Sequence, residues 1–249
     1  MRGCAPGMRG DGGDGRNERS EHVLVVKYPV RGAVKCRLAA GVGSRHATEL
    51  YRLFVLDILG AFRRASLSPI VCHHPPGAAG AFRRWLGPRQ RLLAQRGGDH
   101  PGRMMHAFED LFAAGADRVV MFVSDVPDLS SCLIGMAGRA LERADAVLGP
   151  SGDGGYYVIG FRRGAFVPGA FTGVPWSSER TFRETARRIR EAGWRLRVLP
   201  PCNDVDKRGD LRTLSRRNRA TAFRRSRTMG YLRRHPGLLA PDKGGGGHG

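Results

Sequence analysis

The sequence predicts an α/β protein in which helices cover both faces of a mostly parallel central sheet. Short apolar runs alternate along the chain with longer amphipathic stretches, which is typical of strand–helix–strand units. One of these, Arg118–Ser124 (RVVMFVS), is a continuous apolar run bounded by turn residues, as expected for a strand buried on both faces. Hydrophobic residues make up 41% of the 249, which is enough for a large core and too many for a wholly disordered chain.

The first half of the chain opens with residues 1–20, a Gly-rich polar segment that we expect to be a disordered leader. A strand is expected at His22–Lys27 (HVLVVK), followed by a loop with several Pro and Gly residues at Tyr28–Gly43. Ala47–Arg64 has apolar residues at helical spacing, with Asp57 as a polar break. Shorter patterns then predict strands at Pro69–His73 and Arg91–Gln95 and a helix at Gly102–Ala114.

The second half continues the alternation after the strand at Arg118–Ser124. The pattern predicts a helix at Ser130–Arg143, strands at Ala146–Gly149 and Tyr156–Phe161, a helix at Ser178–Ala192 and a last strand at Arg195–Leu199. From Asp210 onward we expect helical and very basic structure. Residues 236–249 end in GGGGHG and are expected to form a flexible tail, so residues 21–235 make up a single domain.

The composition restricts the compartment and the partners. No apolar run reaches the roughly 18–20 residues that a membrane helix needs, and the N-terminal segment lacks the apolar core of a secretory signal. The five cysteines never form C-x-x-C, which argues against a disulfide framework or a thiolate zinc site and favours a reducing cytoplasm. The net charge of +20 comes mostly from arginine, whose planar fork suits phosphate groups, but the charge alone would attract any polyanion.

The loop after the first strand has the composition of a phosphate-binding site. Lys27 and Pro29 are followed by Gly32, Lys35 and Arg37. Glycine permits close approach of the backbone, and the cations supply positive charge for a diphosphate. The P-loop pattern G-x-x-x-x-G-K-[ST] is absent. From residue types alone, a solvated basic loop explains this segment equally well.

Two carboxylates, Asp125 and Asp128, directly follow the most convincing strand. In a parallel sheet, ligands bind at the carboxyl ends of the strands, so these side chains lie where a site is expected. Mg²⁺ typically binds one or two protein carboxylates together with substrate phosphates. Asp125 is therefore a candidate metal ligand. Asp128 is a candidate cap of the helix expected from Ser130 and is also expected to support the metal ligands without binding the ion itself.

Two further acidic segments lie later in the chain. Asp153 lies in a Gly-Asp-Gly-Gly turn, where it is either an ordinary turn residue or a general base that faces an acceptor hydroxyl. Asp206 follows the last strand in Asn203–Asp206 (NDVD) and either completes a metal site with Asp125 or caps the next helix. The residue types alone favour the cap.

Several motifs occur in a fixed order: Lys27-x-Pro29-x-x-Gly32-x-Val34-Lys35-x-Arg37-Leu38, Gln95…Asp99-x-x-Gly102-Arg103-Met104, Ser124-Asp125-x-Pro127-Asp128-Leu129, Leu148-Gly149-Pro150…Asp153-Gly154-Gly155-Tyr156-Tyr157-x-Ile159-Gly160, Val174-Pro175-Trp176-Ser177 and Asp204-Val205-Asp206. In this order, from about Val23 to Leu214, they resemble a bacterial and archaeal family of glycosyltransferases associated with radical-SAM and selenium-domain genes or with arsenosugar biosynthesis. The chain departs from that family's pattern at Cys36, where Thr is usual, and at Val126, where Cys is usual.

The resemblance implies the nucleotide-diphospho-sugar transferase fold (GT-A, Rossmann-like), with Asp125 and Asp206 as ligands of Mg²⁺ or Mn²⁺. It also implies a set of residues that bind the nucleotide and its diphosphate: Lys27, Pro29, Gly32, Lys35, Arg37, Asp99 and Arg103. Candidates on the acceptor side are Gly154, Gly155, Tyr156 and Trp176. A Trp in a loop most often anchors the loop to the core, and this alternative stays open for Trp176.

Three functions are compatible with these observations. The first is a metal-dependent glycosyltransferase that moves a sugar from a nucleotide-diphospho-sugar to a small-molecule acceptor, with metal and cations neutralising the departing nucleoside diphosphate. The second is a nucleotidylyltransferase that joins a nucleoside monophosphate to a phosphorylated small molecule and releases pyrophosphate. The third is a basic nucleic-acid-binding protein, supported by the eleven Lys or Arg from Lys207 to Arg234. Nucleic acid is the least favoured partner, because no RRM, KH, zinc-finger or homeodomain pattern is present.

Overall fold

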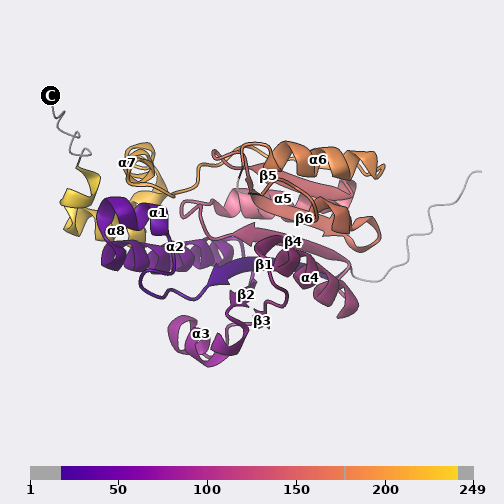
Figure 1. Ribbon diagram of the computed structural model, residues 1–249, viewed down its shortest axis with the longest axis horizontal. Helices are drawn as coiled ribbons and strands as arrows, with labels where there is room; N and C mark the ends of the chain where they lie inside the picture. The colour runs from indigo at the N-terminus through magenta and orange to yellow at the C-terminus, as the bar shows by residue number, and fades with distance from the viewer. Residues whose placement is uncertain (1–17, 177, 241–249) are drawn as a thin grey trace, which may run out of the picture.

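The computed structural model describes residues 18–176 and 178–240, which form one central sheet between two layers of helices (Figure 1). The sheet has seven strands within these residues: β1 (Ser20–Lys27), β2 (Ile70–His74), β3 (Leu92–Ala94), β4 (Arg118–Val123), β5 (Ala146–Pro150), β6 (Tyr156–Arg162) and β7 (Leu196–Val198). They are ordered β3-β2-β1-β4-β6-β5-β7. Of these strands, β6 alone runs antiparallel to its neighbours, so the prediction of a mostly parallel sheet is confirmed.

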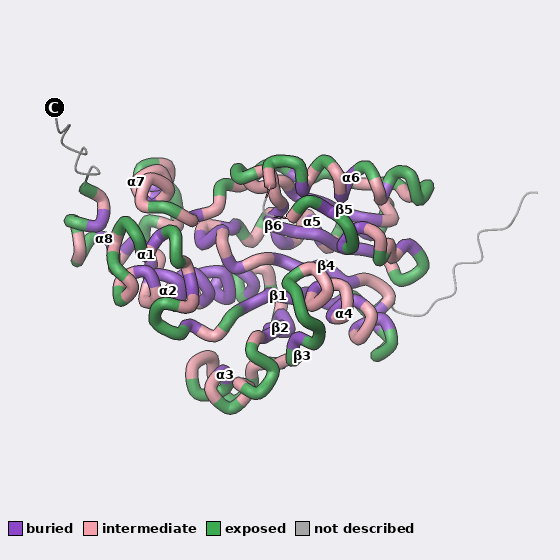
Figure 2. The backbone as a smooth tube through the Cα atoms, viewed as in Figure 1, coloured by how far each residue is buried: buried purple, intermediate pink, exposed green. Residues whose placement is uncertain are grey.

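The helices on the two faces bury alternate residues of the strands. Figure 2 shows that β1 and β4, at the centre of the sheet, are largely buried. On one face, α2 and α5 cover Leu24 and Val26 of β1, and on the other face α4 and α6 cover Val23 and Val25. This alternation follows from the two-residue period of a strand. The described α-helices are α1 (Cys36–Val42), α2 (Ser44–Arg64), α3 (Ala79–Leu86), α4 (His100–Ala113), α5 (Ser131–Arg143), α6 (Thr181–Glu191), α7 (Arg208–Arg217) and α8 (Arg227–Arg234).

Three segments differ from the expectation. The sequence pattern predicted neither α1 nor α3. They are only 7 and 8 residues long, too short for a helical period to stand out in a window of about 11–18 residues, although Phe82, Trp85 and Leu86 of α3 pack against the core. The basic segment is divided into α7, a 3₁₀ turn at Ala222–Arg225 and α8, rather than one helical stretch. Residues 1–17 and 241–249, where a leader and a tail are expected, lie outside the described residues. Within the expected tail, Pro236–Leu239 forms a 3₁₀ turn and buries Leu238.

The C-terminal helices pack against the N-terminal ones and form a third apolar cluster. In Figure 1 the yellow end of the chain lies beside α1 and α2. Leu211 and Leu214 of α7 and Leu232 of α8 are buried there together with Phe54 of α2. Asp57 is buried as well, and its two oxygens accept the backbone N–H groups of Arg227 and Thr228 at 3.0 and 2.9 Å. The expected polar break in α2 therefore anchors the N-terminus of α8.

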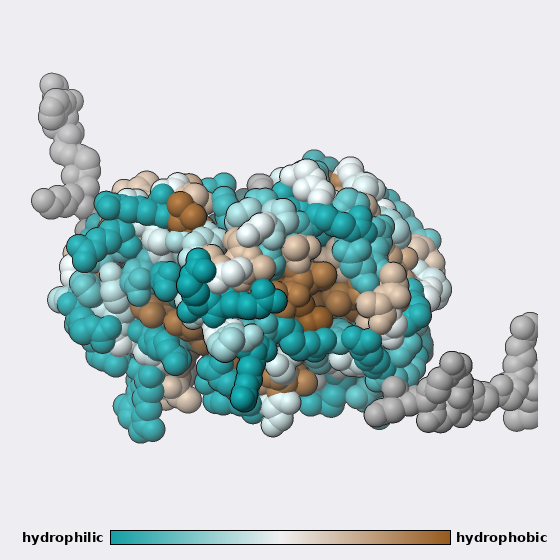
Figure 3. Space-filling model, turned by 90° about the horizontal axis from the view of Figure 1, so that it is seen from below, coloured by the Kyte–Doolittle hydropathy of each residue, from teal (hydrophilic) through white to brown (hydrophobic). Residues whose placement is uncertain are grey.

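The surface in the view of Figure 3 is largely hydrophilic, with hydrophobic residues gathered near the middle of that face. None of the described helices combines the length and the apolar character needed to cross a membrane.

His22 in β1 gives the fold a dependence on pH. Burial lowers the pKa of its imidazole, against a smaller opposing effect of Glu21, and its Nε2 is buried with no hydrogen-bond partner in the described structure. Because the folded protein disfavours the protonated ring, stability is lost as the pH falls below about 6.5, where the unfolded histidine takes up a proton. We expect His22→Leu to remove up to about 1 kcal/mol of the stability loss between about pH 7 and about pH 5.5.

Urea denaturation of both proteins at the two pH values measures this difference. Comparing wild type with variant cancels the contribution of every other titrating group. Equal losses of unfolding free energy in the two proteins would contradict the assignment.

Candidate functional site

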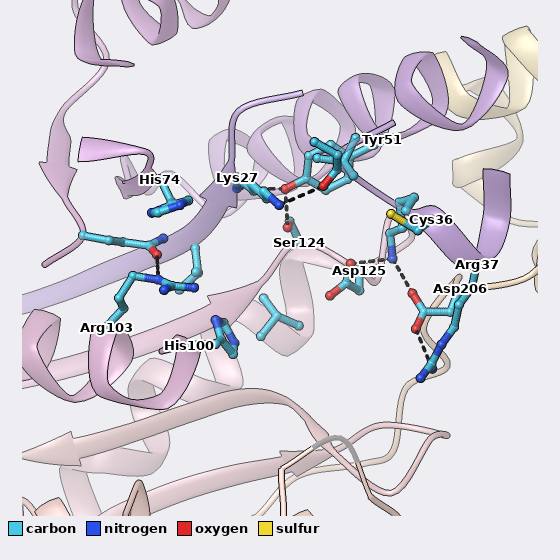
Figure 4. Close-up of a pocket in the computed structure, with 16 residues that line it drawn as sticks. Lys27, Cys36, Arg37, Tyr51, His74, His100, Arg103, Ser124, Asp125 and Asp206 are labelled. Atoms are coloured by element: carbon cyan, nitrogen blue, oxygen red, sulfur yellow. Dashed lines mark hydrogen bonds and ion pairs between the residues drawn. The ribbon is translucent and has the colours of Figure 1, made fainter. Parts of the chain in front are cut away.

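A cavity of about 400 Å³ lies at the carboxyl ends of β1, β2 and β4 (Figure 4). Lys27 is the last residue of β1, His74 is the last residue of β2, and Ser124 and Asp125 directly follow β4. Gln95, which follows β3, lines the same cavity. Ligands of open α/β sheets bind at this edge, so the cavity lies where the topology favours a site.

The loop between β1 and α1 forms one wall of the cavity. Lys27 is exposed and its Nζ donates to the carbonyl oxygen of Ala33 at 2.8 Å, which folds the loop back on itself. Pro29 is buried, Gly32 has a φ of +80°, and Lys35, just before α1, has a φ of +50°. The two left-handed residues turn the chain sharply, and this brings Lys35 back into the cavity.

Lys35 joins two of the predicted carboxylates. Its Nζ lies 2.5 Å from Asp125 Oδ1 and 2.8 Å from Asp206 Oδ1, and its side chain is only 5% exposed. Burial alone would lower the pKa of Lys35, but the charges of the two carboxylates outweigh it and raise that pKa above its usual value. Arg37 Nη1 lies 3.8 Å from Asp206 Oδ2, on the side of the cavity where Figure 4 shows Asp125 and Asp206.

The opposite side of the cavity carries Arg103 (Figure 4). Arg103 Nε donates to Gln95 Oε1 at 3.0 Å, and Nη1 donates to the carbonyl oxygen of Gly98 at 2.6 Å. Gln95 itself is buried, so its hydrogen bond fixes the orientation of the Arg103 guanidinium. Asp99 is not among the residues that line the cavity; it caps α4, where its Oδ1 accepts the backbone N–H of Gly102 at 2.9 Å. The predicted contact of Asp99 with the nucleotide therefore has no support from this placement.

Neutral side chains complete the cavity. Desolvation and then the charges of Arg103 and Lys27 lower the pKa of His74, which keeps this imidazole uncharged near neutral pH. Tyr51 Oη accepts the backbone N–H of Lys27 at 3.0 Å and lies 3.0 Å from Ser124 Oγ. Burial raises the pKa of Tyr51 to about 12. The phenol thus remains protonated and ties the end of β1 to the loop after β4.

Asp128 does not cap α5, so that expectation is wrong; Ser130 is the N-cap. Asp128 instead forms a bidentate ion pair with Arg217 of α7, with both distances 2.8 Å, and accepts from Asn218 Nδ2 at 2.7 Å. Arg217 Nη2 also donates to the carbonyl oxygen of Asn203 at 3.0 Å. One guanidinium therefore holds the loop after β4 and the loop after β7 together.

A second hollow of about 310 Å³ adjoins Asp206. Carboxylate oxygens of Asp153, Asp204 and Asp206 lie within 4.8 Å of one another, which is close enough to share a metal ion. Burial and then the charge of Asp153 raise the pKa of Asp204 to about 6. The expected cap at Asp206 is wrong, because Lys207 is the N-cap of α7. Asp204 was not among the predicted site residues, although the Asp-x-Asp spacing that it forms with Asp206 was a usable signal.

The predicted acceptor-side residues lie elsewhere: Gly154, Gly155, Tyr156 and Trp176 are absent from the described residues that line the two cavities. Gly154 has a φ of +86°, and a Cβ there would lie 2.2 Å from Glu179 Cα, so only glycine fits. Tyr156 is buried, with its ring 5.8 Å from that of Trp176, whose Nε1 donates to the carbonyl oxygen of Phe171 at 3.1 Å. Trp176 thus anchors its loop to the core, which was the alternative to a place on the acceptor side.

Comparison with known proteins identifies the family. The family model described as "Uncharacterized protein conserved in bacteria (DUF2064)" matches residues 58–178. A crystal structure from Desulfovibrio desulfuricans G20, described as a "putative nucleotide-diphospho-sugar transferase", is 40% identical, with a TM-score of 0.85 over 89% of this chain and 97% of that chain. The chain belongs to this nucleotide-diphospho-sugar transferase family. No match to a curated protein was found by sequence.

The fold of this nucleotide-diphospho-sugar transferase family extends to cytidylyltransferases. 4-Diphosphocytidyl-2C-methyl-D-erythritol synthase from Anaerococcus prevotii DSM 20548 is 9% identical, with a TM-score of 0.51 over 78% of this chain and 94% of that chain. A cytidylyltransferase from Leptospira borgpetersenii serovar Hardjo-bovis is 11% identical, with a TM-score of 0.50 over 90% of this chain and 98% of that chain. At these identities the likeness concerns the fold alone.

Proposed function

We propose that this member of the nucleotide-diphospho-sugar transferase family transfers a sugar from a nucleotide-diphospho-sugar to a small-molecule acceptor, with help from a divalent metal ion. The observation that carries the proposal is the meeting of cations and carboxylates in one cavity at the carboxyl ends of parallel strands. The family relationship to the Desulfovibrio desulfuricans protein supports the reaction class. The cations of the cavity are Lys27, Lys35, Arg37 and Arg103.

The acidic residues fit Mg²⁺ or Mn²⁺ by their chemistry. All their donor atoms are carboxylate oxygens, which these hard cations prefer. We assign Asp125 and Asp206 as ligands, with Asp153 and Asp204 close enough to Asp206 to contribute. Burial and then the charge of Asp153 raise the pKa of Asp204, so a cation bound there would stabilise the ionised carboxylate. When bound, the metal would neutralise charge that develops on the departing nucleoside diphosphate.

The side chains of the cavity then have separate tasks. Lys27, at the end of β1, and Arg37, in the first turn of α1, are both exposed and bind the diphosphate by charge. Arg103, held by Gln95, presents a fixed guanidinium from the opposite wall. Asp153, an exposed residue beside the second hollow, stays a candidate general base for the acceptor hydroxyl.

Thermal unfolding with a panel of nucleotides and sugar nucleotides, each with and without Mg²⁺ or Mn²⁺, tests the proposal. A ligand that binds only the folded state raises the melting temperature by mass action. We expect a metal-dependent rise with a nucleoside diphosphate or its sugar, and the responding base identifies the donor. No shift with any member of the panel would contradict the proposed function.

Nucleotidylyl transfer is the second candidate, because the fold is shared with two cytidylyltransferases. Both reactions would use the same cations and metal, so the products distinguish them. Release of pyrophosphate from a nucleoside triphosphate would identify this reaction, and release of a nucleoside diphosphate from a sugar nucleotide would identify sugar transfer. The absence of a G-x-G-[ST]-R-[ML] first loop in the sequence favours sugar transfer.

Cys36 offers a probe of donor binding. Its thiol is exposed and lines the cavity beside Lys35 and Arg37, whereas Cys132 is exposed on α5 and lies outside the lining. A bound diphosphate should shield Cys36 from alkylation by iodoacetamide. At a concentration ten times its Kd, the ligand occupies about nine-tenths of the protein, so we expect the modification rate to fall about tenfold.

Mass spectrometry of the two peptides after timed alkylation measures both rates in one sample. Cys132 is the internal control, and its rate should stay unchanged by the ligand. Equal rates at Cys36 with and without a ligand that raises the melting temperature would mean that the ligand binds elsewhere.

A further inference from the structure

Lys35 is the one cation of the described structure that both proposed metal ligands contact directly. Its ammonium lies within hydrogen-bond distance of Asp125 Oδ1 and Asp206 Oδ1, from the loops after β4 and β7. The Lys35 side chain is almost fully buried, whereas those of Asp125 and Asp206 are 41% and 32% exposed, so a ligand can reach the carboxylates from the solvent side. A positive charge already lies between the carboxylates to which a divalent ion would bind.

The local charge balance explains what this ammonium does. Asp125 and Asp206 carry two negative charges, which Lys35 and the more distant Arg37 balance. A divalent ion between the same oxygens would face the repulsion of the Lys35 ammonium at close range. Metal binding to the free protein therefore has to displace the ammonium first.

A bound diphosphate would offer Lys35 an alternative partner. Lys27, Arg37 and Lys35 line one cavity, so a diphosphate attracted by the first two would lie within reach of the third. The ammonium has three donors and a flexible stem, which allow it to exchange carboxylate oxygens for phosphate oxygens.

We propose that Lys35 is a built-in counter-ion that blocks the metal site until a nucleotide diphosphate draws its ammonium away. Nucleotide and metal then strengthen each other's binding, and this coupling is reciprocal. The inference rests on the proposed function and deepens it, because it states how the two ligands are coupled at that site. It predicts that the free protein holds Mn²⁺ weakly because of Lys35, and not for lack of ligands.

Electron paramagnetic resonance of free Mn²⁺, without nucleotide, tests this directly. We expect Lys35→Met to bind Mn²⁺ at least about tenfold more tightly than the wild type, within the usual range of coupling between sites. Lys35→Gln, which removes the charge but retains a hydrogen-bond donor at the end of the side chain, provides a second variant if the first one unfolds. Lys27→Met is the matched control, because it removes the same charge from the same cavity without a contact to either carboxylate; its Mn²⁺ affinity should stay within about threefold of the wild type.

The outcomes separate the two proposals. Tighter Mn²⁺ binding in the Lys35 variants alone supports the counter-ion. Equal affinity in the wild type and the Lys35 variants overturns it, while a metal-dependent transferase remains. Loss of Mn²⁺ binding in every protein, both alone and with uridine or guanosine diphosphate, overturns the counter-ion together with metal dependence.

Discussion

Replacing Asp206 with Asn is expected to lower metal-supported turnover of the sugar-nucleotide donor by at least about a hundredfold, the usual cost of losing one group that stabilises charge in a transition state. Asp206 is the carboxylate common to both acidic groups of the site. It shares Lys35 with Asp125, and its oxygens lie near those of Asp153 and Asp204. The amide keeps the size of the side chain and removes its charge, so the variant tests electrostatics rather than packing.

Steady-state release of nucleoside diphosphate at several Mn²⁺ concentrations measures the effect. Asp117→Asn is a suitable control, since Asp117 precedes β4 at the other end of the sheet, where its carboxylate accepts the backbone N–H of Arg19 and pairs with the exposed guanidinium of Arg163. Removing this charge should leave turnover within about twofold of the wild type, because surface ion pairs contribute little. Turnover within a few fold of the wild type in Asp206→Asn would show that the metal, if required, binds without this carboxylate.

Replacing Arg217 with Ala is expected to lower the free energy of unfolding by about 2–3 kcal/mol, somewhat less than the loss of a fully buried ion-pair partner. The variant leaves Asp128, whose side chain is 13% exposed, without its bidentate partner. Asn218 still donates to that carboxylate, which limits the loss. We also expect weaker Mn²⁺ binding, because the loops that carry Asp125 and Asp206 lose one of their connections and keep the backbone hydrogen bond from Val205 N–H to the Asp125 carbonyl oxygen.

Urea denaturation of Arg217→Ala and of Arg216→Ala separates the ion pair from a general effect on α7. Arg216 is exposed on the same helix, so its loss should change stability by less than about 0.5 kcal/mol. The double variant Asp128→Asn with Arg217→Ala should recover part of the loss, since it no longer leaves a charge unpaired. Equal effects of the two arginine substitutions would show that the Asp128 ion pair contributes nothing.

The strands and the edge of the sheet that carries the cavity could be predicted from the sequence because both depend on local patterns. Continuous apolar runs are typical of strands buried on both faces, and β4 lies within one residue of the predicted range. The order of strands and helices also predicted that the loops after Lys27 and Ser124 meet at one edge. The structure brings Lys35, Asp125 and Asp206 into contact there.

Features that depend on distant partners could not be predicted in this way. Asp57 is separated by 170 residues from the backbone N–H of Arg227 that it accepts, so its place in α2 indicated only a polar interruption. Asp128 lies 89 residues before its partner Arg217. The sequence showed only its position just ahead of a helix, which is typical of a helix cap. The helices α1 and α3 were missed because they span only 7 and 8 residues, too few for a helical period to be recognised.

The packing of α7 and α8 against α2 has a consequence for synthesis of the protein on the ribosome. Until residues beyond 207 emerge, Phe54 has no cover from Leu211 and Leu232, and Asp57 is without its backbone donors. A nascent chain of this length thus exposes apolar surface that chaperones recognise. Asp206, the distant partner of Lys35, is synthesised at nearly the same late stage, so the contact between Lys35 and Asp206 and the cover of this apolar surface form together.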